Sequence, residues 1–392
     1  MITNLLLTLS LLQTPAQVTA PLEAPFHIAE DAIIVDAVIN GKTISFMFDT
    51  GFGGQFIIND QINIGPYTGT VSLQDFVGVF QAHKVDVKGF QIGQLKQSKT
   101  VAEAIMQPVA HMSQSYGAHT DGIMGLGAVI DYVTEINFEH SKFIFHPKSL
   151  DITKRKPDNK RTFLIKMEPR GMNAVVLPTE INGQPLHLAL DTGNAFYATT
   201  HKEVLERAKL WDSEKKPLFV KQSMVASGPV DSFSMLIPNA TIFGVPVKDS
   251  AWDIIDLPAA SVQSDGTVGF GFLKNFNIIL DYERRYVWLE NFTGKVKDDL
   301  KGEPGFALYR KEGGGYVIFM VYKGSPAAEK GIKEDDTLLA VDGTSLSSVT
   351  PSKVRELLQG APDSICKLVI SRGGIIQHID VPRKLMVNYP AN

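Results

Sequence analysis

The chain has 392 residues, of which 44% are apolar and 20% charged, and its formal net charge is −4. This length allows two or three domains of ordinary size, and the composition is that of a soluble globular protein. The slightly acidic charge provides no basic surface for nucleic acid. The single cysteine, Cys366, excludes an internal disulfide and a cysteine-based zinc site, and we expect its thiol to be buried and inert.

The N-terminal segment predicts export. Residues 1–20 hold an apolar run followed by small residues that include Ala16 and Ala20, which is typical of a secretory signal peptide. The run is too short for a stable membrane span, no lysine or arginine precedes it, and Pro21 disfavours cleavage after Ala20. The alternative is a disordered or membrane-associating tail. Because export without disulfides suits a bacterial periplasm, we expect a periplasmic protein.

An internal repeat starts in the next segment. Residues 35–51 and 177–193 each read as a strand, an Asn-Gly turn and a second strand that ends in Asp-Thr-Gly, at a constant offset of 142 positions. Asn-Gly between apolar strands is a strong hairpin signal. Residues 121–127 and 265–271 also match each other, as Asp-Gly-Ile-Met-Gly-Leu-Gly and Asp-Gly-Thr-Val-Gly-Phe-Gly.

The repeat predicts two duplicated β-rich units. Charged turns between apolar strands near residues 137–145 and 281–288 look like a closing hairpin in each unit. We place the units at residues 21–150 and 160–293, with a charged connector between them. Apolar residues at helical spacing predict a helix from about residue 200 to 210.

The two Asp-Thr-Gly turns are the candidate site. Each would place a carboxylate, Asp49 or Asp191, at the tip of a buried strand, where glycine permits a sharp turn and a threonine hydroxyl can bond backbone across the pair. Two carboxylates brought within a few ångströms cannot both ionise readily, so they share one proton. Such a pair can activate a trapped water. The residues expected to support the two loops are Thr50, Gly51, Thr192 and Gly193.

These motifs resemble the pepsin and retropepsin superfamily, and specifically bacterial aspartyl peptidase-like proteins with a PDZ domain. The resemblance covers about residues 30–292 and rests on an apolar residue before each Asp-Thr-Gly and on segments 123–125 and 267–269, which match the family's apolar-apolar-Gly motif except at Thr267. It implies an aspartic endopeptidase that hydrolyses peptide bonds through a water held by Asp49 and Asp191. It implies no metal or organic cofactor, and no dimerisation, since both half-sites lie in one chain.

The sequence departs from that family pattern after each turn. The family usually has a small or hydroxyl residue that bonds the outer carboxylate oxygen, but this chain has Phe52 and Asn194. Phe52 cannot form that bond, whereas the Asn194 amide can donate it. Residues 67–81 stand where the family closes a flap, and Tyr67, Phe76 and Phe80 there are read as core or wall residues rather than as site residues.

The C-terminal segment resembles a bacterial PDZ domain over residues 302–385. Ser325 suits a helix N-cap, Pro326 the first helical position and Gly331 the C-terminal cap, and a second helix is expected at about 350–359. Asp335 stands where the family usually has glycine, and Asp tolerates the left-handed backbone that this turn needs.

The resemblance implies that Gly305, Phe306 and Ala307 form the loop whose N–H groups hold a peptide's C-terminal carboxylate, with the peptide added as a strand. A domain that only packs on the rest of the chain is the alternative.

The sequence therefore predicts a mainly β protein, with a two-lobed acid-protease fold and an appended α+β PDZ-like domain. The expected partners are a protein or peptide substrate and peptide C-termini. No His-Glu-x-x-His or Gly-x-Ser-x-Gly motif supports a zinc or serine hydrolase. The alternative function is a catalytically inactive peptide-binding protein of the cell envelope, which Phe52 favours.

Overall fold

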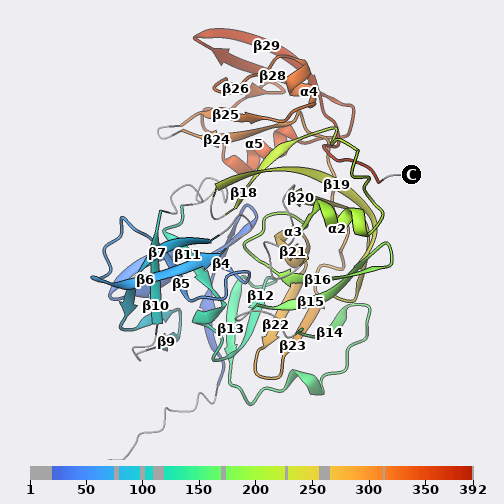
Figure 1. Ribbon diagram of the computed structural model, residues 1–392. Coiled ribbons are helices and arrows are strands. Elements are labelled where there is room, and N and C mark those ends of the chain that lie inside the picture. Colours follow the sequence, from blue (N-terminus) through green and yellow to red (C-terminus); the bar gives the residue numbers. More distant parts are fainter. Residues whose placement is uncertain are drawn as a thin grey trace, which may run out of the picture.

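The computed structural model describes residues 20–74, 79–97, 102–108, 119–168, 174–225, 228–255, 265–311 and 314–390. Apart from Ala20, the predicted signal segment lies outside these residues. Most of the described chain is arranged in four β-sheets (Figure 1). The prediction of a mainly β protein is confirmed.

The first sheet contains the first Asp-Thr-Gly turn. Its ten strands run in the order β6-β7-β10-β5-β11-β4-β3-β8-β9, with β2 beside β3. The β3–β4 hairpin turns at Asn40-Gly41, where φ is 48° and 82°, as the Asn-Gly signal predicts. The strands are β2 (His27–Ala29), β3 (Ala32–Ile39), β4 (Lys42–Asp49), β5 (Phe56–Asn59), β6 (Tyr67–Gln74), β7 (Val79–Val87), β8 (Phe90–Ile92), β9 (Leu95–Gln97), β10 (Ala102–Gln107) and β11 (Gly122–Gly125).

The second sheet contains the second turn. Its seven strands run in the order β15-β16-β21-β17-β20-β19-β18, and β15 also pairs with β19. The Asn182-Gly183 turn repeats the left-handed geometry of the first hairpin, with φ of 48° and 75°. The strands are β15 (Val176–Ile181), β16 (Gln184–Leu190), β17 (Ala198–His201), β18 (Lys221–Val225), β19 (Gly228–Ile242), β20 (Val245–Ile255) and β21 (Gly266–Val268).

The helix predicted at about 200–210 is present but shorter. It is α2 (Lys202–Arg207), which buries Val204 and Leu205. Lys209 has a left-handed φ of 57°, and this conformation ends the helix before residue 210.

The repeat extends to strand register. β4 pairs in parallel with β11, which places Phe48 opposite Met124, and β16 pairs in parallel with β21, which places Leu190 opposite Val268. A short helical turn follows each inner strand, η1 (Leu126–Ala128) after β11 and α3 (Phe270–Leu273) after β21. Each Asp-Thr-Gly turn therefore occupies the same place in its own sheet.

A third sheet joins the two repeats. Its six strands run in the order β1-β13-β12-β22-β23-β14, and β12 pairs with β22, with Ile136 opposite Ile278. The closing hairpins expected in each repeat are confirmed as β12–β13 and β22–β23. The strands are β1 (Leu22–Pro25), β12 (Val133–Asn137), β13 (Lys142–His146), β14 (Thr162–Lys166), β22 (Phe276–Asp281) and β23 (Tyr286–Asn291), and the 3-10 turn η2 (Ile152–Lys154) lies between β13 and β14.

The C-terminal sheet forms its own unit with a separate core, to which the buried Cys366 belongs. The predicted caps are confirmed, because the Ser325 side chain accepts from Ala328 N at 3.2 Å and Gly331 has a φ of 74°. Asp335 adopts the expected left-handed backbone, with a φ of 69°. Its elements are β24 (Phe306–Arg310), β25 (Tyr316–Val321), α4 (Pro326–Glu329), β26 (Thr337–Val341), β27 (Thr344–Ser345), α5 (Pro351–Leu358), β28 (Ile365–Arg372) and β29 (Ile375–Pro382).

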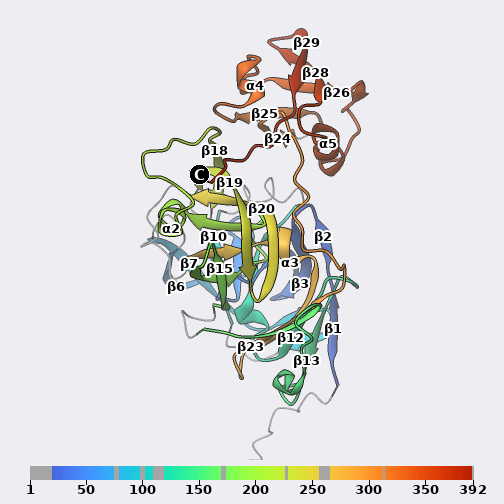
Figure 2. The ribbon, with the colours of Figure 1, turned by 90° about the vertical axis from the view of Figure 1, so that its right-hand side faces the viewer.

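The C-terminal unit lies at one end of the molecule and contacts both repeats (Figure 2). Lys323 pairs with Val220, and Asn388, beyond β29, forms a bridge with Met235 on β19. On the other side, the Arg355 guanidinium on α5 binds the Asp31 carboxylate in the β2–β3 turn. The C-terminal unit is thus attached by backbone pairing on one side and an ion pair on the other.

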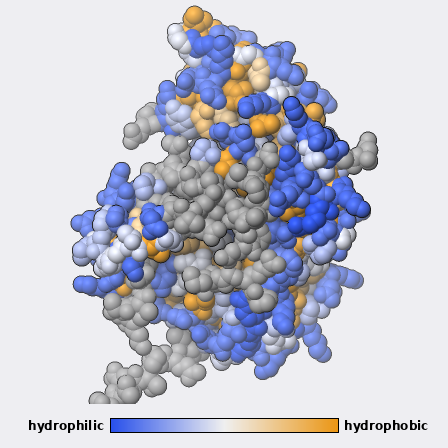
Figure 3. Space-filling model, in the orientation of Figure 1, coloured by the Kyte–Doolittle hydropathy of each residue, from blue (hydrophilic) through white to orange (hydrophobic). Residues whose placement is uncertain are grey.

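Within the described part of the chain, no helix is both long and apolar enough to cross a bilayer. The C-terminal strands carry exposed apolar side chains, and orange surface lies over the upper part of Figure 3, where Figure 1 places these strands. They include Phe319, Ile365, Ile375 and Ile376, which are 42%, 46%, 67% and 61% exposed.

Candidate functional site

The two Asp-Thr-Gly turns meet and exchange hydrogen bonds. Thr50 N donates to Thr192 Oγ1 at 3.1 Å, and Thr192 N donates to Thr50 Oγ1 at 2.9 Å. Each hydroxyl then donates its own hydrogen across the pair, Thr50 to Leu190 O and Thr192 to Phe48 O, both at 2.7 Å. Both threonines are buried, so four hydrogen bonds join the turns out of contact with water.

The two glycines allow the turns to approach this closely. A Cβ on Gly51 would lie 2.8 Å from Asp191 Cγ, and a Cβ on Gly193 would lie 2.5 Å from Asp49 Cγ. Each glycine therefore lies against the carboxyl group of the opposite turn, at a distance that no other residue permits. The structure brings all six predicted site residues of the two turns together.

The Asp49 carboxyl group accepts hydrogen bonds from the backbone of its own turn. Its Oδ1 accepts from Gly51 N at 2.7 Å and from Phe52 N at 3.2 Å. Burial raises the pKa of Asp49, and the hydrogen bonds from Asp191, from its own turn and from Gly193 N oppose that rise.

The Asp191 carboxyl group also accepts hydrogen bonds from the backbone of its own turn. Its Oδ1 accepts from Gly193 N at 2.9 Å and Asn194 N at 3.1 Å. Burial, the charge of Asp49 and the hydrogen bond to Asp49 raise the pKa of Asp191 well above its ordinary value, and the Thr267 hydroxyl partly opposes this. The two groups are thus a hydrogen-bonded carboxyl pair that disfavours double ionisation.

The expected role of the Asn194 amide is wrong. Its Nδ2 does not bond the outer carboxylate oxygen but donates to Thr199 Oγ1 at 2.9 Å and Thr267 Oγ1 at 2.7 Å. The Thr267 side chain, on β21, lowers the pKa of Asp191. Sequence reasoning noticed Thr267 only as a departure from an apolar motif, and that departure was the signal that could have found it.

The Phe52 ring packs over two glycines of its own repeat. A Cβ on Gly54 would lie 2.3 Å from Phe52 Cζ, and one on Gly125 would lie 2.5 Å from Phe52 Cδ1. The ring is therefore folded over these glycines, and it packs against an apolar cluster that includes Ile123. Phe52 supplies its backbone N–H to Asp49 but no side-chain hydrogen bond.

The predicted flap segment forms the β6–β7 hairpin. Tyr67 is 55% exposed and stacks on His83, with ring centroids 4.4 Å apart. Of the two readings, core or wall, the core reading of Tyr67 is therefore wrong, because more than half of its surface is exposed. Phe76 and the Phe80 side chain lie outside the described residues.

The predicted peptide loop begins the first strand of the C-terminal sheet. Gly305 has a φ of 90°, Phe306 is buried and Ala307 is half-buried. The Gly305 carbonyl accepts from Tyr322 N at 3.0 Å. β24 is the edge strand of its sheet and pairs with β25 alone among the described strands, so its outer backbone is placed to accept another strand.

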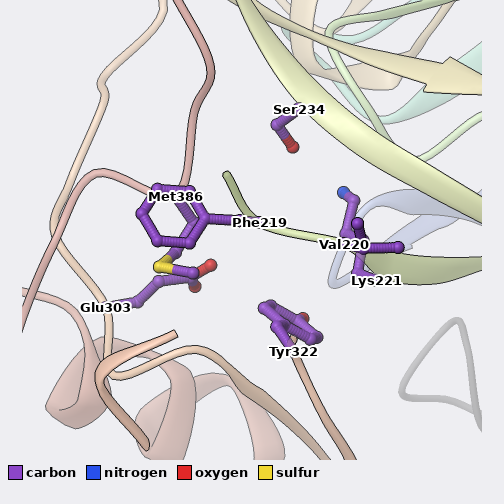
Figure 4. Close-up of a pocket in the computed structure, with 7 residues that line it drawn as sticks. All are labelled: Phe219, Val220, Lys221, Ser234, Glu303, Tyr322 and Met386. Carbon is purple, nitrogen blue, oxygen red and sulfur yellow. The ribbon is translucent and has the colours of Figure 1, made fainter. Parts of the chain in front are cut away.

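A small pocket of about 20 Å³ lies where the C-terminal unit meets the second repeat (Figure 4). Burial raises the pKa of Glu303, which faces this pocket. Its volume suits about one water molecule rather than a peptide. It is lined by Phe219, Val220, Lys221, Ser234, Glu303, Tyr322 and Met386.

Among the described residues, no group of three or more His, Cys, Asp and Glu side chains is arranged to hold a metal ion.

Comparison with known proteins identifies one part of the chain. The family described as "PDZ domain" matches residues 320–372. Of the solved structures, the photosystem II D1 C-terminal processing protease is 27% identical over 23% of this chain and 24% of its own, with a TM-score of 0.21. The chain thus spans about a quarter of that protein, and the likeness is local. The C-terminal unit of this chain contains a PDZ domain.

Proposed function

We propose that this protein is an aspartic endopeptidase with a two-lobed acid-protease fold, in which Asp49 and Asp191 activate the attacking water. The observation that carries the proposal is the reciprocal bonding of Thr50 and Thr192, which holds two carboxyl groups face to face. An aspartate that only caps a turn does not require a second carboxyl group beside it. Here two carboxyl groups are buried next to each other and the pKa of each is raised, which is typical of a catalytic pair.

In the proposed reaction the pair starts with one shared proton. The ionised carboxyl removes a proton from the water while the water oxygen bonds to the scissile carbonyl carbon, and the protonated carboxyl donates to the carbonyl oxygen. The resulting tetrahedral diol collapses as the carbon–nitrogen bond breaks. The carboxyl that took the proton of the water gives it to the leaving nitrogen, and a diol hydroxyl returns its proton to the other carboxylate. One water is consumed, no acyl-enzyme forms, and the pair returns to its original protonation state.

The test is cleavage of an unfolded protein by the purified full chain, from acid to neutral pH. Asp49→Asn and Asp191→Asn should each abolish cleavage, because an amide can neither accept the proton from water nor share one with its neighbour. Asp60→Asn is the matched control, since Asp60 is exposed and belongs to neither turn. Cleavage that survives Asp49→Asn would exclude this mechanism.

The second candidate is a peptide-binding protein without peptidase activity, and the PDZ match at residues 320–372 favours it. In the proposal, a peptide's C-terminal carboxylate binds the backbone N–H groups at Gly305, Phe306 and Ala307, and its chain adds to the free edge of β24. The Asp49→Asn protein should therefore bind peptides that end in a free carboxylate and not the same peptides amidated. Equal affinity for both forms would contradict this docking mode. Binding together with no cleavage by the wild type would favour the second candidate.

We also propose that the protein is exported to the periplasm, and residues 1–20 support this. Cell fractionation and N-terminal sequencing of the mature protein test it, with a start after Ala16 or Ala20 expected. A cytoplasmic protein that begins at Met1 would contradict export.

A further inference from the structure

The PDZ domain is attached to the second repeat along β18. Val220, just before this strand, exchanges two backbone hydrogen bonds with Lys323 of the PDZ domain, at 3.2 and 2.9 Å. Two residues further on, Gln222 N donates to Met320 Sδ at 3.3 Å. Lys221, between them, pairs with β19 instead. Since β18 thus lies between the PDZ domain and the second repeat, the backbone of Lys221 is held from both sides.

The side chain of Lys221 contacts the interior of the second repeat. Its Nζ lies 3.0 Å from Asp253 Oδ1 on β20 and 4.2 Å from the ring centroid of Phe196. The two charged side chains are 15% and 1% exposed, so salt screens their ion pair only weakly. Ser223 Oγ donates to Asp253 Oδ2 at 2.7 Å, which orients the carboxylate. Lys221 therefore contacts both an oriented anion and the face of an aromatic ring, which attracts a cation.

Phe196 belongs to residues 194–196, which follow the second Asp-Thr-Gly turn and are called here the second-turn loop. Asn194 N donates to Asp191 Oδ1 at 3.1 Å, and Asn194 Oδ1 accepts from Phe196 N at 2.9 Å. The ring that Lys221 contacts is therefore two hydrogen bonds away from the Asp191 carboxyl group.

The first repeat does not share this arrangement. The strand order β6-β7-β10-β5-β11-β4-β3 of the first sheet corresponds to β18-β19-β20-β17-β21-β16-β15 of the second, so β6 is the counterpart of β18. Among the described strands, β6 pairs with β7 alone. At the constant offset of 142 positions, Gly54 stands where the second repeat has Phe196, so no ring is available there to a cation. The contact is thus found in the repeat whose edge strand binds the PDZ domain.

We propose that Lys221 is a positioning residue that joins the PDZ domain to the carboxyl pair: the PDZ backbone holds β18, and the Lys221 ammonium group holds Phe196 and with it the second-turn loop. The PDZ domain thereby supports the geometry of Asp191 from a distance, through contiguous contacts. The inference rests on the proposed peptidase function only for its kinetic readout, because the order of the loop can be measured without activity.

The first pair of variants tests the attachment of the PDZ domain. Lys323→Pro removes the backbone N–H that donates to Val220 O. Lys323→Ala is the matched control, because it changes the same side chain and keeps that N–H. If the attachment supports the second-turn loop, the Asn194 N–H should exchange with solvent about tenfold faster in the proline variant than in the wild type, and at the wild-type rate in the alanine variant.

The second set of variants tests the contact of Lys221 with the loop. Lys221→Met removes the cation and should also raise exchange at Asn194 about tenfold, whereas Lys221→Arg keeps a cation that can lie over a ring and should restore most of the protection. Phe196→Leu removes the ring but leaves the ion pair with Asp253 in place, and should raise exchange at Asn194 as well. This variant keeps the test decisive if Lys221→Met, which leaves the buried Asp253 carboxylate without its cation, does not fold.

The kinetic readout separates positioning from loss of folded protein. In Lys323→Pro and Phe196→Leu, kcat should fall about tenfold per folded molecule, and KM should change less, because the contact acts on the carboxyl pair rather than on substrate binding. A mere loss of folded protein would lower the concentration of active sites and leave both constants of the remaining enzyme unchanged.

The decisive experiment is amide hydrogen exchange of the full chain, followed by NMR. The first Asp-Thr-Gly turn is the internal reference, because Gly51 N and Phe52 N bond Asp49 as Gly193 N and Asn194 N bond Asp191. Faster exchange at Asn194 in Lys323→Pro and Phe196→Leu, with a smaller change in the first turn, is the expected result.

Wild-type exchange at Asn194 in both Lys323→Pro and Phe196→Leu would overturn the proposal, even if the protein is a peptidase. Equal acceleration in the two Asp-Thr-Gly turns would also overturn it, because the variants would then loosen the whole site. Conversely, an inactive wild type whose variants show the expected exchange would leave the role of Lys221 intact and remove the proposed function.

Discussion

Thr50 and Thr192 each donate a backbone N–H to the hydroxyl of the other, at 3.1 and 2.9 Å. Residues 142 positions apart in the sequence thus form a symmetric, buried contact between the two halves of the duplicated unit. This contact fixes the distance between the carboxyl groups that flank it, so positioning of the carboxyl pair and cohesion of the two halves depend on the same four hydrogen bonds.

Replacement of Thr192 by valine should lower both stability and activity. The change removes the bond to Phe48 O and leaves Thr50 N without its acceptor, and the loss of buried partners costs about 2 kcal/mol in the free energy of unfolding. Chemical denaturation of the full chain measures this. Thr192→Ser should retain most of the stability, and Thr179→Val, which removes an unbonded hydroxyl, should cost much less. Equal losses in the two valine variants would show that the contact contributes nothing specific.

Replacement of Gly193 by alanine should damage the site more than the fold. The new methyl group would lie 2.7 Å from Asp49 Oδ2 and force the carboxyl groups apart. A displacement of about 1 Å in a reacting group reduces rates about 100-fold, so kcat should fall by at least that factor. Gly69→Ala is the control, because its Cβ would meet only the flexible Lys84 side chain. Undiminished kcat in Gly193→Ala would contradict the close approach of the turns.

The raised pKa of Asp191 predicts that Asp191→Asn stabilises the protein at neutral pH. Below the unfolded pKa of about 3.9 the carboxyl group is protonated in both states, and the variant should differ little from wild type. As pH rises above that value, the unfolded state ionises first, and the wild type loses stability until the folded pKa is passed. Thermal unfolding across this window should show a gain for Asp191→Asn that grows with pH. A gain that shrinks toward neutral pH would contradict a raised pKa.

In the PDZ domain, the carboxylate of Asp336 predicts the opposite pH dependence. Burial alone would raise its pKa, but Arg372 Nε at 2.7 Å and Nη2 at 2.6 Å outweigh burial and hold the pKa below the ordinary value. The resulting stabilisation is present above about pH 3.9 and is lost as pH falls through the folded pKa.

Arg372→Met should therefore destabilise the PDZ domain by about 3 kcal/mol at neutral pH, since the Asp336 carboxylate, whose side chain is 1% exposed, would be left without its cation. Below about pH 3.9 the difference should diminish, because the unfolded state binds a proton first and the folded wild type follows as pH falls through the lowered pKa of Asp336. Arg310→Met, at an exposed arginine, is the control, and chemical denaturation at the two pH values is the measurement. A loss that does not depend on pH would point to packing rather than to the ion pair.

Local signals in the sequence predicted the structural features that local chemistry determines. Asn40-Gly41 and Asn182-Gly183 set their hairpins through left-handed φ values, and Ser325 caps its helix. The internal repeat by itself predicted that Asp49 and Asp191 lie at equivalent strand ends. The two-lobed acid-protease fold and the domain boundaries remain predictions.

Contacts between distant segments were not predictable in the same way. The pairing of β12 with β22 joins hairpins that the sequence placed in separate units, and nothing in either hairpin specifies its partner. Asn388 bonds Ser234 across 154 positions, where no local pattern marks the contact. Asn194 was assigned the wrong partner because its direction depends on β21, which crosses beneath the turn only in the folded chain.

The central claim is that Asp49 and Asp191 share a proton, and carboxyl titration of the 13C-labelled full chain tests it most directly, with Asp49→Asn and Asp191→Asn to assign the signals. The account predicts two separate steps, of which at least one lies well above the ordinary aspartate value of about 3.9, and predicts that either variant collapses them into one. Two independent titrations near that ordinary value would contradict it.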